Sequence, residues 1–278
     1  MKKLSLTLTF LTLITALSAQ PPAIHVDQHG AGDPVILLPG FATPASVWDE
    51  TIENIQGEYT YYQVSYAGFN GLAPVDTPWY QSVREALFDY VESNNLNNLT
   101  LIGHSMGGNL ATEVAATMPE RVQQLIIVDA IPCMREVMMP GVDPKYIRYD
   151  SPPVTRMLQM SEDSMRHTVR MTAQNMTQQP ARVDTLVQWM MRADRETYVY
   201  GYTDLLKMDL RPQLDQISAE TLILGAPSPD EAVVRQNYTE QYANLANKTI
   251  RIAPDSRHFI MFDQPEWFYK QINAALAK

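Results

Sequence analysis

Short runs of consecutive apolar residues recur along the chain and alternate with segments of helical spacing. Consecutive rather than alternate apolar positions indicate strands that are buried on both faces, as in a parallel sheet. The predicted strands are Val35–Leu38, Tyr61–Val64, Leu99–Ile102, Leu125–Val128, Thr221–Leu224 and Thr249–Ile252. The predicted helices are Pro44–Ile55, Thr77–Glu92, Met106–Met118, Glu231–Leu245 and Pro265–Leu276. This order predicts an α/β fold with a mostly parallel central sheet flanked by helices.

One long segment interrupts this alternation. Between Met134 and Leu210 no buried strand pattern occurs, and Met, Leu, Val and Tyr recur at helical spacing. We therefore predict a helical cap, residues 134–210, inserted into a core made of residues 20–133 and 211–278. The segment holds eleven of the fifteen methionines. Their adaptable side chains either pack the cap onto the sheet, which we favour, or line an acyl pocket.

The first nineteen residues differ from the rest of the chain. Lys2 and Lys3 precede an apolar stretch that ends in the small residues Ser18 and Ala19. This pattern is typical of a secretory signal peptide, and the stretch is shorter than the roughly 20 apolar residues that span a bilayer. We expect residues 1–19 to be removed, leaving an exported periplasmic or extracellular protein without a stable membrane anchor.

Charge and cysteine content narrow the function classes. The formal net charge is −10, and loss of the two lysines with the leader takes it to −12. So acidic a chain is unsuited to polyphosphate contacts, which argues against nucleic acid as a partner. Cys133 is the only cysteine, so no intramolecular disulfide is expected, and a small buried side chain is its favoured role. Clustered His and Cys spacing is missing from the sequence, so we predict no metal site.

The most informative motif is Gly103-His104-Ser105-Met106-Gly107. It fits G-x-S-x-G and stands between a predicted buried strand and a predicted helix, the setting of a nucleophile elbow. Such a turn is tight enough to need glycine on both sides of the serine. It also points the amino end of the helix at the hydroxyl, where negative charge is favoured. Ser105 is therefore the predicted nucleophile.

An attacking serine needs an oxyanion hole and a base. The loop Pro39-Gly40-Phe41 follows an earlier strand, and we predict that the backbone amides of Phe41 and Met106 bind the oxyanion. In nucleophile-elbow enzymes the histidine comes after the serine in sequence, which leaves His167 in the cap and His258 in the loop after the last strand. Because a loop position suits a base that must reach Ser105, we favour His258.

The oxyanion loop, the elbow and the segment from His258 to the terminal helix resemble the α/β-hydrolase superfamily in order and spacing. The resemblance runs from about Ile24 to the end and is weakest in the cap. It implies a Ser, acid, His triad, in a superfamily that holds esterases, lipases, lactonases, peptidases and cofactor-free peroxidases.

The acid departs from the pattern of many members, because Ser228 stands at its usual place. Asp230 comes two residues later, while Asp129 occupies another location known in the superfamily, the end of the preceding strand. We favour Asp129, because Pro227 and Pro229 make the other loop stiff. Asp230 is also well placed as a helix N-cap.

The expected function is that of a serine hydrolase that cleaves carboxylic esters of small or medium acyl groups through an acyl-enzyme, with a small-molecule substrate and no cofactor. A lactonase and an aminopeptidase of the same fold are the alternatives within enzymes. The aminopeptidase would need cap acids such as Glu162 and Asp163 to hold an ammonium group. A non-catalytic ligand-binding homologue is the alternative from another class. The oligomeric state is not predicted.

Overall fold

The computed structural model describes residues 21–277 and contains a seven-stranded sheet in the order β1-β3-β2-β4-β5-β6-β7. Its strands are β1 (Ile24–Gly30), β2 (Asp33–Leu38), β3 (Tyr59–Tyr66), β4 (Leu99–His104), β5 (Val122–Val128), β6 (Glu220–Gly225) and β7 (Lys248–Ile252). All neighbouring pairs are parallel except β1 and β3, which are antiparallel. The predicted α/β fold with a mostly parallel sheet is confirmed.

All six predicted strands are present, and β1 is the strand that the sequence pattern missed. It lies at the edge of the sheet, and most of its side chains face solvent. An edge strand that is covered on few positions lacks the continuous apolar run of the buried strands. For the same reason its antiparallel pairing with β3 could not be read from the sequence.

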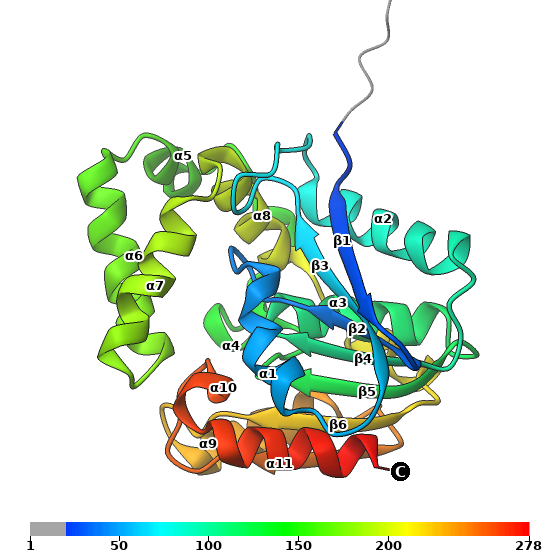
Figure 1. Cartoon of the computed structure of the whole chain (residues 1–278). Helices are drawn as coiled ribbons and strands as arrows, with labels where there is room; N and C mark the ends of the chain where they lie inside the picture. The colour runs from blue at the N-terminus through cyan, green and yellow to red at the C-terminus, as the bar shows by residue number, and fades with distance from the viewer. Residues whose placement is uncertain (1–20, 278) are drawn as a thin grey trace, which may run out of the picture.

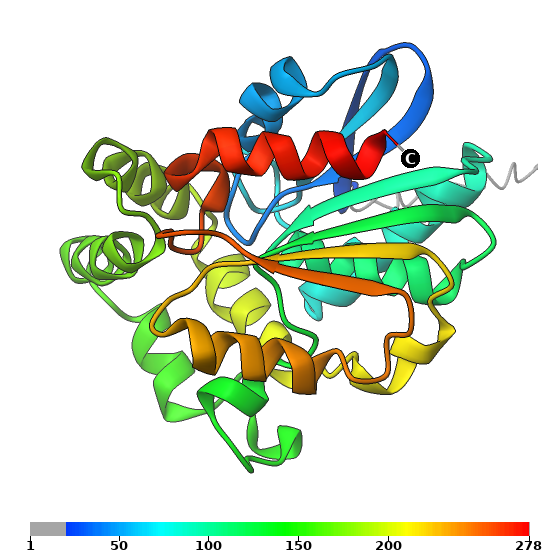
Figure 2. The same cartoon turned by 90° about the horizontal axis from the view of Figure 1, so that it is seen from below.

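Helices cover both faces of the sheet (Figures 1 and 2). The helices of the core are α1 (Asp49–Asn54), α2 (Trp79–Ser93), α3 (Met106–Thr117), α9 (Glu231–Gln241), α10 (Ile260–Asp263) and α11 (Pro265–Leu276). Short 3-10 helices, Ala45–Trp48 and Arg211–Gln216, precede α1 and β6. Seen from below in Figure 2, α1 and α11 lie on one face, and α3 and α9 lie on the other.

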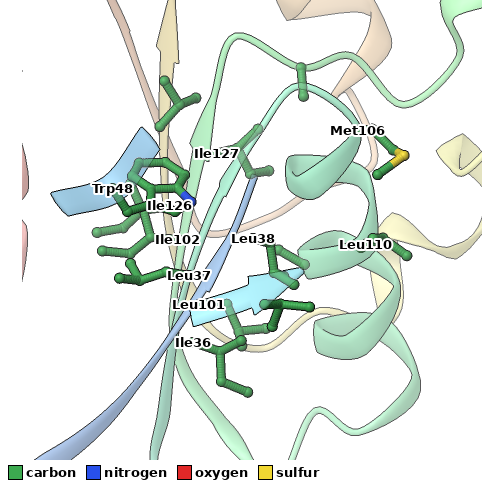
Figure 3. Packing of buried hydrophobic residues seen from close by; sticks show 14 of the residues in the cluster. Ile36, Leu37, Leu38, Trp48, Leu101, Ile102, Met106, Leu110, Ile126 and Ile127 are labelled. Carbon is green, nitrogen blue, oxygen red and sulfur yellow. The ribbon is translucent and has the colours of Figure 1, made fainter. Parts of the chain in front are cut away.

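The core of the sheet forms where β2, β4 and β5 run side by side. Ile36, Leu101 and Ile126 are almost fully buried, and their strands are in register. Trp48 packs with these strands on one side, and Leu110 of α3 lies on the other (Figure 3). Side chains buried on both faces explain the unbroken apolar runs of these strands.

Between β5 and β6 the chain forms a group of helices that stands to one side of the sheet in Figure 1. Its helices are α4 (Met134–Met138), a 3-10 turn at Pro144–Tyr146, α5 (Pro152–Leu158), α6 (Glu162–Met176), α7 (Pro180–Met191) and α8 (Arg195–Lys207). We call α4–α8 the cap. The predicted leader, residues 1–19, lies outside the described residues and stays a prediction. Within residues 21–277 no helix has the length and apolar character needed to cross a membrane.

Helix α8 attaches the cap to the core. The backbone amide of Asp194 donates to the carbonyl of Gly68 at 2.7 Å, and Asp204 accepts from the amide of Tyr80 at the start of α2. In the middle of α8, a Cβ at Gly201 would lie 2.9 Å from the ring of Trp79 and 3.0 Å from the ring of Phe41. Glycine therefore lets this helix pack directly on aromatic rings of the core.

The junction of β4 and α3 is packed still more tightly. A Cβ at Gly103 would lie 2.2 Å from the carbonyl oxygen of Gly107, and a Cβ at Gly107 would lie 2.1 Å from the carbonyl oxygen of Leu38. Side chains cannot occupy such positions without moving backbone. The sheet thus brings the end of β4 and the start of α3 against the end of β2.

We predict that Gly103→Ala lowers the free energy of unfolding by about 3 kcal/mol, the upper part of the range for an overpacked site. The matched control is Gly141→Ala, where φ is +75° and no heavy atom lies within 4 Å of the added Cβ. In this control the only cost is that of placing alanine in a left-handed backbone conformation, about 1 kcal/mol. Urea unfolding followed by circular dichroism measures both, and equal losses would contradict the packing explanation.

Candidate active site

Ser105 stands alone between β4 and α3 in an unusual backbone conformation. Its φ of 54° and ψ of −124° are sparsely populated by residues with side chains, so its backbone is strained. The Ser105 amide donates to the carbonyl of Val128 at 2.8 Å, and the Ser105 carbonyl accepts from Gly108 at 2.8 Å. The nucleophile-elbow turn expected from the sequence is therefore formed.

The loop after β2 lies beside this serine. A Cβ added at Gly40 would lie 3.3 Å from the Cβ of Ser105, which measures how closely the two loops approach. Among the described residues, no protein group accepts a hydrogen bond from the backbone amide of Phe41 or Met106. Met106 is the first residue of α3, whose amino end favours negative charge. Both predicted oxyanion donors are thus unpaired beside Ser105.

The structure pairs His258 with Asp129. Nδ1 of His258 lies 2.6 Å from Oδ2 of Asp129, and their side chains are 25% and 16% exposed. Asp129 directly follows β5, and His258 lies in the loop between β7 and α10. His258 and Ser105 line the same cavities, although no hydrogen bond joins them in this structure. Such bonds often tighten only when a substrate binds.

Three groups hold the Asp129 carboxylate. Besides His258, the backbone amide of Ala226 donates to Oδ1 at 2.8 Å and the hydroxyl of Tyr238 donates at 3.0 Å. Burial alone would raise the pKa of Asp129, but its hydrogen bond and ion pair with His258, together with the Ala226 amide, hold that pKa below its usual value. Burial and the charge of Asp129 raise the pKa of Tyr238 well above its usual value, so its hydroxyl keeps the proton. No sequence motif pointed to Tyr238.

The alternative acid is placed elsewhere. Asp230 is the N-cap of α9 and accepts hydrogen bonds from the amides of Ala232 and Val233. It is exposed, and the structure shows it as a cap rather than as a partner of His258. His167 is exposed on α6, and Cys133 is buried without a disulfide.

His104, inside the elbow motif, has a fixed orientation. It is fully buried, its ring lies 4.6 Å from that of His258, and its Nε2 donates to the His258 carbonyl at 3.0 Å. The carbonyl can only accept, so Nε2 carries the proton and Nδ1 is left without a partner among the described residues. Burial and the nearby His258 lower the pKa of His104 to about 3. The ring is therefore neutral at physiological pH and positions the backbone of His258.

Two cavities meet at Ser105, and both include Met134, Leu205 and His258 in their walls. We call the first the Trp189 cavity; its volume is about 370 Å³. Its other lining residues include Phe41, Met157, Met176, Leu186, Met190, Tyr198 and Tyr202. Four cap methionines thus line the Trp189 cavity, and their role in an acyl pocket stays a prediction. Others, such as Met165, are buried in the packing of the cap.

The second, which we call the Asn109 cavity, has a volume of about 310 Å³. It is lined by residues that include Met106, Asn109, Asp129, Val137, Met138, Ser228, Val233, Asn237 and Tyr238. A larger cavity, of about 440 Å³, is lined by Gln124, Lys248 and Arg251 among others. Neither Ser105 nor Asp129 nor His258 lines this cavity.

Residues 35–271 match the family model described as "Alpha/beta hydrolase family". The chain belongs to this family. Its fold agrees with that of an esterase from Exiguobacterium antarcticum, with a TM-score of 0.77 and 19% identity over 94% of this chain and 100% of that one. It also agrees with an enol-lactonase from Burkholderia xenovorans, with a TM-score of 0.76 and 15% identity over 92% and 96% of the two chains. At these identities the likeness shows the fold alone.

Relatives by sequence include pimeloyl-[acyl-carrier protein] methyl ester esterases. The one from Aeromonas salmonicida is 28% identical over 81% of this chain and 91% of its own length. The one from Legionella pneumophila is 35% identical over 43% of this chain, a match that spans 47% of that protein. Both of these relatives are named as ester hydrolases.

The buried neutral His104 makes stability depend on pH. Its pKa is about 3 in the folded chain against 6.5 for a free histidine, so only the unfolded state takes up this proton as the pH falls below about 6.5. Its contribution is therefore complete above that pH and is lost toward pH 3, at up to about 1.4 kcal/mol per pH unit.

We expect His104→Gln to reduce the slope of unfolding free energy against pH between about pH 6 and 4, because glutamine still donates to the His258 carbonyl but does not titrate. Urea unfolding at several pH values measures the slope in both proteins. Asp129 titrates in both and cancels from the comparison. Equal slopes in the two proteins would contradict the assignment of this pH dependence to His104.

Proposed function

We propose that this protein is a serine esterase that cleaves uncharged carboxylic esters of small to medium acyl groups. The observation that carries the proposal is the 2.6 Å contact between Nδ1 of His258 and Oδ2 of Asp129, which line one cavity together with Ser105. Membership of the α/β hydrolase family and similarity to named esterases support it.

In this proposal the Ser105 Oγ attacks the ester carbonyl carbon, and His258 takes the hydroxyl proton. The negative charge on the carbonyl oxygen is stabilised by the amides of Phe41 and Met106, each worth on the order of 3 kcal/mol. His258 then gives its proton to the departing alcohol oxygen as the carbon–oxygen bond breaks. Water repeats the sequence on the acyl-enzyme, releasing the acid and restoring Ser105. Asp129 orients the imidazole and stabilises its charged form.

The walls of the Trp189 cavity favour an apolar acyl group. Within the described residues its lining includes aromatic and thioether side chains and no Asp, Glu, Lys or Arg. A charged acyl group would lose its hydration there without finding a partner. The cap methionines can adjust to chains of different shape.

The aminopeptidase alternative needs a carboxylate near Ser105 to bind an ammonium group. Glu162 and Asp163, the cap acids considered for that role, are exposed at the start of α6, and Glu162 pairs with Arg166. Asp129 faces the Asn109 cavity but is already bonded to His258. The geometry therefore favours an ester over a peptide.

We predict that Ser105→Ala abolishes hydrolysis of p-nitrophenyl butanoate, because no other group can form the acyl-enzyme. Loss of activity is measured by release of p-nitrophenol, with circular dichroism to show that the variant folds. A fluorophosphonate probe should label the parent protein and not the variant. Retained hydrolysis in folded Ser105→Ala would refute Ser105 as the nucleophile, whereas a parent protein that is neither labelled nor active would favour a ligand-binding role.

A second prediction separates the two acids. Asp129→Asn should lower kcat by at least about a hundredfold, since the amide cannot stabilise the imidazolium. Asp230→Ala should leave kcat within about threefold and lower the unfolding free energy by about 1 kcal/mol through loss of the α9 cap. Steady-state kinetics and urea unfolding of both variants test this. A larger kcat loss in Asp230→Ala than in Asp129→Asn would reverse the assignment.

A further inference from the structure

The wall of the Asn109 cavity includes a buried amide whose oxygen has no partner among the described residues. Asn109 lies on α3, and its backbone amide donates to the Ser105 carbonyl at 3.2 Å. The side chain is buried, with 7% of the residue exposed, and its Oδ1 has no hydrogen-bond partner among the described residues. An unpaired buried amide oxygen costs about 1–3 kcal/mol. The other buried polar side chains of α3, Thr112 and Glu113, both have hydrogen-bond partners.

The position of Asn109 relates this side chain to the reaction. Asn109 follows Ser105 by four residues, its backbone amide is bonded to the Ser105 carbonyl, and both residues line the Asn109 cavity, so a group attached to the reacting carbonyl enters the cavity that Asn109 lines. The carboxamide offers one acceptor and two donors, and oxygen and nitrogen exchange places when the amide turns over. A hydroxyl, which both donates and accepts, matches either orientation.

The outer part of the Asn109 cavity indicates which arm of the ester enters it. Val137, Met138 and Val233 line it and are 43%, 55% and 50% exposed. This exposed apolar rim opens the cavity to solvent. The alcohol is the first product to leave, and it needs an open path while the acyl group stays bound to Ser105. The Trp189 cavity, covered by the cap helices α6–α8, suits the acyl group that stays.

We propose that the Asn109 cavity binds an alcohol arm that carries a second hydroxyl, and that Asn109 selects it by a hydrogen bond. The preferred substrates are then monoesters of short diols or triols. This inference rests on the esterase function proposed above and adds the class of leaving group.

A pair of esters of equal size tests the proposal. The second hydroxyl of 2-hydroxyethyl butanoate takes the place of the terminal methyl group of propyl butanoate. Acid release is followed at constant pH to give kcat/KM for both. We expect the parent protein to prefer the hydroxyethyl ester by about 2- to 10-fold, as one neutral hydrogen bond provides.

In Asn109→Leu, whose side chain has the same branched arrangement of heavy atoms without polar groups, the ratio of the two kcat/KM values should fall to about one. Thr172→Val removes a hydroxyl from the Trp189 cavity and should keep the parent ratio. A merely structural role of Asn109 lowers both rates by the same factor and leaves the ratio unchanged, which overturns the proposal. No preference in the parent protein overturns it too, since water then satisfies Asn109. Asn109→Ser, which offers a hydroxyl in place of the carboxamide, serves if the leucine variant does not fold, and its ratio should remain above one.

A second pair of esters shows whether Asn109 contacts the alcohol arm or the acyl arm of the substrate. Propyl 3-hydroxybutanoate and propyl 3-methylbutanoate differ by the same exchange in the acyl group. A preference that depends on Asn109 in this pair instead of the first would overturn the assignment to the alcohol. Failure of the parent protein to hydrolyse p-nitrophenyl butanoate contradicts the esterase function itself, and the assignment falls with it. Normal hydrolysis of that ester with an unchanged ratio contradicts the assignment alone.

Discussion

The contact between the first turn of α3 and the end of β2 is the constraint on which the site depends. Gly107 approaches the Leu38 carbonyl so closely that no side chain fits between them, and Gly103 packs on Gly107 in the same way. Ser105, placed between these glycines, is held in a strained backbone conformation with a positive φ. The same approach sets Gly40 beside Ser105. This close contact thus fixes the positions of both the nucleophile and the loop proposed to bind the oxyanion.

The acid is positioned by the parallel register of the sheet. Val128 at the end of β5 pairs with His104 of β4 and with Leu224 of β6, so the residues that follow these strands gather at one edge. Asp129, the first residue after β5, can then accept from the amide of Ala226 after β6. Its left-handed φ of 45° turns the carboxylate toward the loop that carries His258. Backbone hydrogen bonds between neighbouring strands hold this arrangement without a covalent cross-link.

Much of the fold and of the candidate site could be predicted from the sequence. Buried parallel strands give unbroken apolar runs, and the elbow has a steric need for glycine, so both leave a local signal. The edge strand β1 left none because solvent covers much of it. The choice between Asp129 and Asp230 depends on where two loops lie in space, which spacing along the chain does not encode. Tyr238 and Asn109 escaped notice because a buried hydroxyl or amide is identified by its neighbours, and those come from distant parts of the chain.

The contact of Gly201 with the rings of Phe41 and Trp79 bears on how the cap can be exchanged. Cap helices line the Trp189 cavity, so replacing them is a route to a new substrate range. In this protein the cap is not an independent module. Its helix α8 packs on the ring of Phe41, the residue whose backbone amide is proposed to bind the oxyanion. A grafted cap must therefore keep glycine at position 201, or the loop of Phe41 must be redesigned together with it.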